Sequence, residues 1–256
     1  LELDMEVHFF LMTPDVFKSG KQVGLSTESS GSAQHYLLLE EFYRTGLLLA
    51  GRYLAWWLVP PEHEDNYDIY LAQLRRKGVL REAEYIDFGG IPRVPAEEFF
   101  GAALWHLYKG VDSPYKSVLK LLLAEIYAAE YPASDLLCLR YKNAIYQGEV
   151  DLSKLDPYMM LYQRIEEHLV KSNNNKERLE LVRRCFYFKV NERLSLVDRR
   201  RNSWRRDLIH EMVKTWGWDP DHLAALDAHG SWKIDRVMHE RRVLVSQLTK
   251  SYQALS

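Results

Sequence analysis

The clearest alternation of apolar and polar side chains lies near the start of the chain, over residues 5–12. In an extended strand successive side chains project to opposite sides, so the odd positions of this segment would form an apolar face. Glu6 and His8 would share the other face. Thr13-Pro14-Asp15 follows at once, and proline lacks the amide hydrogen that a sheet needs. We therefore predict one strand that ends near residue 12.

The remainder of the chain repeats its apolar residues at helical spacing. After a loop rich in Gly and Ser at 18–32, we predict helices at about 32–50, 63–77, 95–109, 113–131, 136–147, 157–171, 176–197, 203–216, 220–228 and 231–253. Gly78 and Gly110 would close two of these helices, and Ser113-Pro114 would open another as an N-cap followed by proline. An isolated strand cannot satisfy its edges, so it either pairs with preceding strands or lies on the helices. The expected fold class is mainly α with a short β element (α+β).

The composition favours a globular protein with a substantial core. Of the 256 residues 47% are hydrophobic, and the net charge of -2 gives no general attraction to nucleic acid or to an anionic membrane. The segment 183–206 holds nine Lys and Arg, and we interpret it as a solvated helix face rather than as a nucleic-acid site. No apolar run approaches the roughly 20 residues of a membrane span. Cys138 and Cys185 are far apart, which argues against a disulfide framework or a zinc site and fits a reducing cytoplasm.

Several catalytic motifs are incomplete in this sequence. His210-Glu211 and His239-Glu240 begin like a zinc-protease helix, but Lys214 and Val243 stand where the second histidine is needed. Asp219-Pro220-Asp221 has the spacing of a metal-binding acid pair, yet a proline before a helix favours a helix cap. Nucleophile-elbow, Walker-type and dinucleotide-binding glycine patterns are absent from the sequence. Nothing in these patterns argues for a hydrolase or a dehydrogenase.

The most distinctive segment is 98–109, which reads Glu-Phe-Phe-Gly-Ala-Ala-Leu-Trp-His-Leu-Tyr-Lys. It resembles the signature of the class I adenylate cyclases of enterobacterial type, with Phe99 in the place of a tyrosine. Further blocks that look like the family, in the family's order, lie at 31–35, 41–45, 112–116, 181–187 and 231–235. The resemblance covers nearly the whole chain. It implies an internal fragment of a larger protein, because both ends fall inside the family's pattern.

The family is similar to the polymerase-beta-like nucleotidyltransferases, and the resemblance implies two parts. Residues 1–31 would be the last strand and loop of a nucleotidyltransferase core, and 32–256 the helical region that follows it. Such cores hold two Mg²⁺ ions on three carboxylates, so that one ion activates the 3′-hydroxyl and the other neutralises the triphosphate. The resemblance implies Glu6 as the third acid, both catalytic and metal-binding; the alternative is an ordinary edge-strand glutamate. Neither Gly31-Ser32 nor Gly230-Ser231 is followed by an Asp-x-Asp pair, so we expect most of the Mg²⁺ site upstream and an inactive fragment.

Two groups of residues are candidates for binding the phosphates of ATP. Ser29, Gly31 and Ser32 lead into a predicted helix, whose amides and dipole favour an anion, although such loops also serve as simple helix caps. Lys109 and Lys116, with Lys120 one turn further on, surround a predicted turn and would neutralise a triphosphate. A solvated lysine face is the alternative. The large aromatic residues nearby are interpreted as core rather than as a base-stacking platform, namely Trp56, Trp57, Trp105 and Tyr108.

The resemblance therefore implies a cytoplasmic adenylate cyclase that converts ATP to 3′,5′-cyclic AMP and pyrophosphate. It also implies a regulatory region beyond Ser256 that responds to the sugar phosphotransferase system. Two alternatives stay open: another nucleotidyltransferase that transfers AMP, and a non-enzymatic helical interaction module. Magnesium-dependent ATP binding would separate the module from either enzyme.

Overall fold

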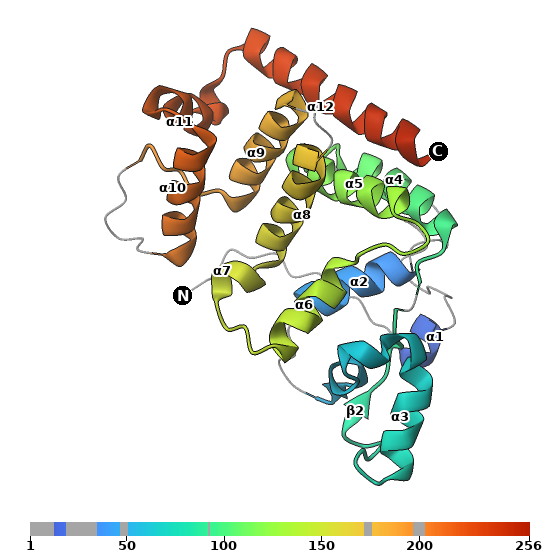
Figure 1. Cartoon of the computed structure of the whole chain (residues 1–256). Helices are drawn as coiled ribbons and strands as arrows, with labels where there is room; N and C mark the ends of the chain where they lie inside the picture. Colours follow the sequence, from blue (N-terminus) through green and yellow to red (C-terminus); the bar gives the residue numbers. More distant parts are fainter. Residues whose placement is uncertain (1–12, 19–34, 47–50, 92, 172–175, 197–202) are drawn as a thin grey trace.

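The computed structural model describes residues 13–18, 35–46, 51–91, 93–171, 176–196 and 203–256. These residues are mostly helical, as the sequence predicts, with a small sheet (Figure 1). The predicted strand at 5–12 lies outside them, and so does the predicted loop at 18–32 except for Lys18, which is the last residue of helix α1. The α-helices are α1 (Pro14–Lys18), α2 (His35–Thr45), α3 (Tyr67–Arg76), α4 (Ala96–Lys109), α5 (Pro114–Ala129), α6 (Leu137–Tyr146), α7 (Leu152–Leu155), α8 (Pro157–Lys171), α9 (Lys176–Val190), α10 (Trp204–Trp216), α11 (Pro220–Asp227) and α12 (Ile234–Leu255).

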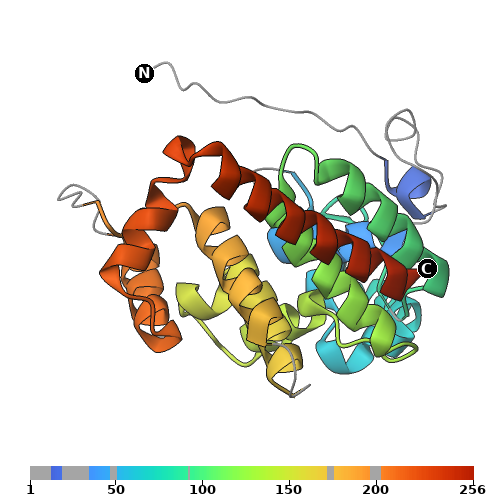
Figure 2. The ribbon, with the colours of Figure 1, turned by 90° about the horizontal axis from the view of Figure 1, so that it is seen from above.

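Helix α5 forms the centre of the helical assembly. It packs against α4, α8, α9 and α12, and Figure 2 shows the long α12 lying across α4 and α5. A helix that is apolar on most of its surface must be covered on most of its surface. The buried side chains of α5 accordingly occupy nearly every position from Ser117 to Leu123. This arrangement places the helix made from the signature segment, α4, between the core and the surface.

The sheet among the described residues consists of two very short parallel strands, β1 (Tyr53–Leu54) and β2 (Tyr85–Ile86). The sequence analysis did not predict either strand, because two residues are too few to show a period. The 3-10 helices η1 (Ala55–Leu58) and η2 (Pro61–Asn66) follow β1 and lead into α3. This pair of strands does not amount to a polymerase-beta-like core, so that part of the fold class stays a prediction.

Three predicted helix ends can be compared with the structure. Gly78 has a φ of +69°, the left-handed conformation expected just past a helix. Gly110 also follows its helix but is right-handed, with a φ of -65°. A Cβ at Gly110 would lie 3.3 Å from Leu248 Cδ1, so glycine here permits the close approach of α12. Asp219 caps α11 as predicted, because its carboxylate accepts a hydrogen bond from the amide of His222 at 2.7 Å.

The predicted aromatic core is correct in part. Trp56 is fully buried and stacks on Tyr43 with ring centroids 4.3 Å apart. Trp57 and Trp105 are half-buried. Tyr108 is 56% exposed, so its assignment to the core was wrong. It lies on the outer face of α4, where the helical period points it away from α5.

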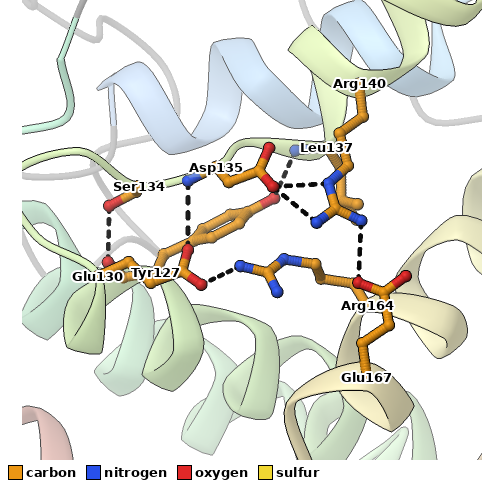
Figure 3. Close-up of polar contacts among 8 residues, drawn as sticks. All are labelled: Tyr127, Glu130, Ser134, Asp135, Leu137, Arg140, Arg164 and Glu167. Atoms are coloured by element: carbon orange, nitrogen blue, oxygen red, sulfur yellow. Dashed lines mark hydrogen bonds and ion pairs between the residues drawn. The ribbon is translucent and has the colours of Figure 1, made fainter. Parts of the chain in front are cut away.

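Polar side chains connect α5, α6 and α8 on one side of this core (Figure 3). The Tyr127 hydroxyl accepts a hydrogen bond from the amide of Leu137 at 2.8 Å, which ties α5 to the first turn of α6. Arg140 of α6 bonds both to Asp135 at 2.6 Å and to Glu167 of α8 at 3.2 Å. These contacts set the position of the short α6 relative to the two longer helices.

Candidate functional site

The first residue of the signature segment, Glu98, closes the N-terminus of α2. Its carboxylate accepts hydrogen bonds from the amides of Tyr36 at 2.8 Å and Leu37 at 2.9 Å. The first amides of a helix have no partner within the helix, and a negative group there also interacts well with the helix dipole. Glu98 therefore links the signature helix α4 to the helix that follows the Gly- and Ser-rich loop.

This contact occurs in a buried place. Glu98 is only 4% exposed, and burial raises its pKa to about 7, against the lowering effect of the Tyr36 and Leu37 amides. Because Glu98 occupies these two amides, a phosphate bound at the same helix end would need other donors. Ser29, Gly31 and Ser32, the predicted donors, lie outside the described residues, and their role stays a prediction.

Lys109, at the C-terminus of α4, lies over aromatic rings of its own helix. Its ammonium nitrogen is 4.8 Å from the centroid of Trp105 and 5.5 Å from that of Tyr108. A cation in this position is attracted by the faces of the rings. The structure thus gives Lys109 a local partner, and its predicted role in nucleotide binding stays a prediction.

Lys116 and Lys120 lie one turn apart on α5, but their surroundings differ. Lys120 forms an ion pair with Glu41 of α2, whereas Lys116 is exposed and has no ion-pair partner among the described residues. His106 of α4 lies close to both lysines. Burial, together with the charges of Lys120 and Lys116, lowers the pKa of His106 to about 3, while the charge of Glu41 opposes them. His106 is therefore neutral at physiological pH.

A further lysine faces the same region from α9. Burial lowers the pKa of Lys189, and the charge of Lys116 acts in the same direction. The Lys189 ammonium lies 4.2 Å from the ring centroid of Tyr158 at the start of α8. Lys116, Lys120 and Lys189 thus form a set of neighbouring cations, which we call the α5–α9 lysine cluster. Such a cluster can bind an anion, because each phosphate oxygen accepts hydrogen bonds from cationic donors. The sequence analysis missed Lys189, since nothing local links it to Lys116.

A polar hollow of about 400 Å³ lies beside the N-terminus of α2, lined by residues of α1, α2, η2, α3 and the segment after β2. Asp87, just beyond β2, organises this region. It accepts a hydrogen bond from the Tyr67 hydroxyl at 2.9 Å and forms ion pairs with Lys18 at 2.5 Å and Arg75 at 3.7 Å. The sequence analysis did not single out Asp87. The sequence feature that could have indicated it is an acidic residue that follows Tyr85-Ile86 and comes shortly before Gly89-Gly90.

The structure tests the Mg²⁺ prediction only in part. Glu6, the predicted catalytic and metal-binding acid, lies outside the described residues. Within the described ranges, no three His, Cys, Asp or Glu side chains come together as a metal site. Carboxylate oxygens are the ligands that Mg²⁺ prefers, and the acids described above already pair with lysine, arginine or backbone amides. The described residues therefore do not fit a Mg²⁺ centre.

The basic segment 183–206 carries ion pairs in the part that the structure describes. Arg183 pairs with Glu166 at 3.6 Å, and Arg184 pairs with Glu240 at 3.4 Å. The side chains of Arg183 and Arg184 are only 21% and 22% exposed, so this part of the segment is an ion-paired, half-buried helix face rather than the solvated face that the sequence predicted. No described helix is long and apolar enough to cross a membrane.

Comparison with known proteins agrees with the sequence resemblance. A family model described as "Adenylate cyclase, class-I, second domain" matches residues 94–256, and one described as "Adenylate cyclase NT domain" matches residues 1–57. The chain is 46% identical over 257 residues to the adenylate cyclase of Proteus mirabilis and 45% identical over 253 residues to those of Escherichia coli K12 and Salmonella typhimurium.

Each of these alignments covers 99% of this chain and 30% of the relative, so the chain spans about a third of the length of the curated relatives that it matches. No solved structure gives a significant match. The family model for the second domain covers well over half of the sequence and includes the signature helix α4. The chain therefore belongs to the class-I adenylate cyclase family.

Proposed function

We propose that this chain is part of the catalytic region of an adenylate cyclase and helps to convert ATP to 3′,5′-cyclic AMP. In this reaction the ribose 3′-oxygen attacks the α-phosphorus of ATP, and pyrophosphate leaves as the ring closes. The observation that carries the proposal is the match of residues 94–256 to the class-I second-domain model, together with 45–46% identity to named adenylate cyclases. Adenylate cyclases generally use Mg²⁺, and we place its ligands outside the described residues.

The α5–α9 lysine cluster is the part of the described structure that we assign to the triphosphate. Lys116 supports this assignment best, because its ammonium is exposed and pairs with no described acid. Phosphoryl transfer depends mainly on positioning the substrate and on neutralising its negative charge. A lysine without an acidic partner can neutralise the charge of the triphosphate. Neutral His106 beside it adds no competing charge and provides a ring nitrogen for a hydrogen bond.

The first experiment compares the chain alone with a chimera. The purified chain should produce no cyclic AMP from magnesium-ATP, because no Gly-Ser turn of its sequence is followed by the Asp-x-Asp pair that a two-ion site needs. The chimera replaces the matching segment of the Escherichia coli relative with this chain, and it should restore cyclic AMP in cells that lack their own cyclase. A folded chimera without activity, in conditions where the relative is active, would contradict the proposed function.

The second experiment tests Lys116 within the active chimera. Lys116→Gln should raise the KM for ATP about tenfold, the effect of losing about 1.4 kcal/mol of binding. Lys77→Gln, at an exposed lysine beyond α3, is the matched control and should leave KM unchanged. Equal KM values for both variants would remove Lys116 from the nucleotide site without affecting the assignment of the whole chain.

A further inference from the structure

The α5–α9 lysine cluster lies where the first turns of α5 and α8 meet the last turn of α9. Tyr115 and Phe188, which precede Lys116 and Lys189 in the sequence, pack with their ring centroids 4.5 Å apart. The Lys189 ammonium in turn lies 4.2 Å from the ring centroid of Tyr158, the second residue of α8. These contacts bring lysines from two helices to one place, and the groups around them determine which part of a nucleotide the place can recognise.

Positive charge exceeds negative charge at this place. Lys120 has an acidic partner in Glu41. Lys116 and Lys189 form no ion pair with any described residue, and Lys116 is exposed to solvent. The charge of Lys116 acts with burial to lower the pKa of Lys189, which shows that the two ammonium groups are close enough to repel each other. An anion that reached both lysines would remove this repulsion.

The flat groups beside the cluster are already covered. A nucleobase binds tightly where it can stack on a free aromatic face or on a guanidinium plane. The face of Tyr158 at the cluster carries the Lys189 ammonium. Arg205, in the first turn of α10, has its guanidinium 5.1 Å from the ring centroid of Trp204. Neither group therefore offers a base a free surface at the cluster.

The carboxylates beside the cluster are also engaged. The exocyclic amines of adenine and guanine donate hydrogen bonds, so their recognition needs an acceptor. Glu41 is paired with Lys120. Asp156 accepts a hydrogen bond from the amide of Tyr158 at 2.9 Å and lies 3.2 Å from the guanidinium of Arg205. The free groups are thus the ammonium donors of Lys116 and Lys189, which suit phosphate oxygens.

We propose that the α5–α9 lysine cluster binds the triphosphate of a nucleotide without recognising its base, so that adenine is selected by residues outside this cluster. The inference rests on the proposed function, because it defines what the triphosphate site recognises. It assigns Lys189 to the site together with Lys116. Its test measures binding to the 256-residue chain and uses no activity assay, so its failure and the failure of the proposed function are distinguishable.

The probes are ATP, GTP and methyl triphosphate, which share a triphosphate ester and differ in what is attached to it. Calorimetric titration without Mg²⁺ leaves the lysines alone to meet the phosphates. The three dissociation constants should agree within about threefold, and adenosine should show no saturable binding. A base that stacked on the protein would instead tighten binding by about five- to 100-fold relative to methyl triphosphate.

Lysine variants test the location of the site. Lys116→Gln and Lys189→Gln should each weaken the binding of methyl triphosphate about tenfold, because each removes a cationic donor to the phosphates. Lys77→Gln, at an exposed lysine beyond α3, is the matched control and should bind as the wild type does. Circular dichroism would check that the variants fold, and the exposed position of Lys116 keeps the test valid if Lys189→Gln does not.

Three results would each overturn the inference. The first is binding of ATP at least about tenfold tighter than that of GTP and methyl triphosphate, which would show that the chain recognises adenine. The second is equal affinity of Lys116→Gln and Lys77→Gln for methyl triphosphate, which would place the site elsewhere. The third is the absence of saturable binding of methyl triphosphate. Each of them leaves the chimera assay, and with it the proposed function, to be decided separately.

Discussion

The buried ion pair between Glu64 and Lys142 gives the sharpest test of how this core is held together. The side chain of Lys142 is fully buried, and its ammonium lies 2.9 Å from Glu64 Oε2 and 4.2 Å from the ring centroid of Trp56. The other oxygen of Glu64 accepts hydrogen bonds from Trp56 Nε1 at 2.9 Å and from the amide of Ile91 at 2.8 Å. One carboxylate thus connects η1, η2, α6 and the segment after β2.

Lys142→Met removes the cation and keeps a side chain of similar length. The carboxylate of Glu64 then stays buried without its countercharge, and breaking such a pair costs about 3–5 kcal/mol. For a chain of this size each kcal/mol lowers Tm by about 2–4 °C, so we expect Tm to fall by about 10 °C. Chemical denaturation followed by tryptophan fluorescence would measure the loss, because Trp56 lies at the pair.

Two controls separate burial from charge. Lys154→Met removes a lysine whose ammonium is 2.8 Å from Glu149, but Lys154 is largely exposed, so stability should not change measurably. Glu64→Gln combined with Lys142→Met should recover more than half of the loss, since a neutral amide still accepts from Trp56 and Ile91. The reasoning would be refuted if Lys142→Met were as harmless as Lys154→Met, or if the double variant were no more stable than the single one.

Three further predictions rest on single contacts. Below pH 4.5 Glu98 is protonated in both the folded and the unfolded chain, and between pH 4.5 and about 7 only the unfolded chain loses this proton. The free energy of unfolding of the wild type should therefore fall by about 3 kcal/mol over this range relative to that of Glu98→Gln. Parallel pH profiles of the two proteins would contradict this prediction. Gly90→Ala places a Cβ 2.8 Å from Tyr67 Cβ and should cost about 1–3 kcal/mol in denaturant, whereas Gly230→Ala, with open space around it, should be neutral. Asp219→Ala removes the cap of α11 and should cost about 1 kcal/mol by the same assay; an unchanged midpoint would show that this cap contributes nothing.

The sequence predicted the helices well where the apolar period is long. The helices expected at 95–109, 157–171 and 203–216 match α4, α8 and α10 to within a residue at each end. Their periods persist over several turns, and glycine, proline or an N-cap marks their ends. The signature segment also identified the family, which the family model and the relatives then confirmed. These features are local, and a sequence shows local features directly.

The tertiary structure decided the contacts between distant segments. Glu98 meets the amides of Tyr36 and Leu37 some 61–62 residues away, and Lys142 meets Glu64 across 78 residues. No local period encodes which buried acid meets which cation, because such pairs form only when packing removes both groups from water. The same packing brought Lys189 beside Lys116. The sequence alone determined the helices and the family, and the packing of α5 among its neighbours determined the candidate sites.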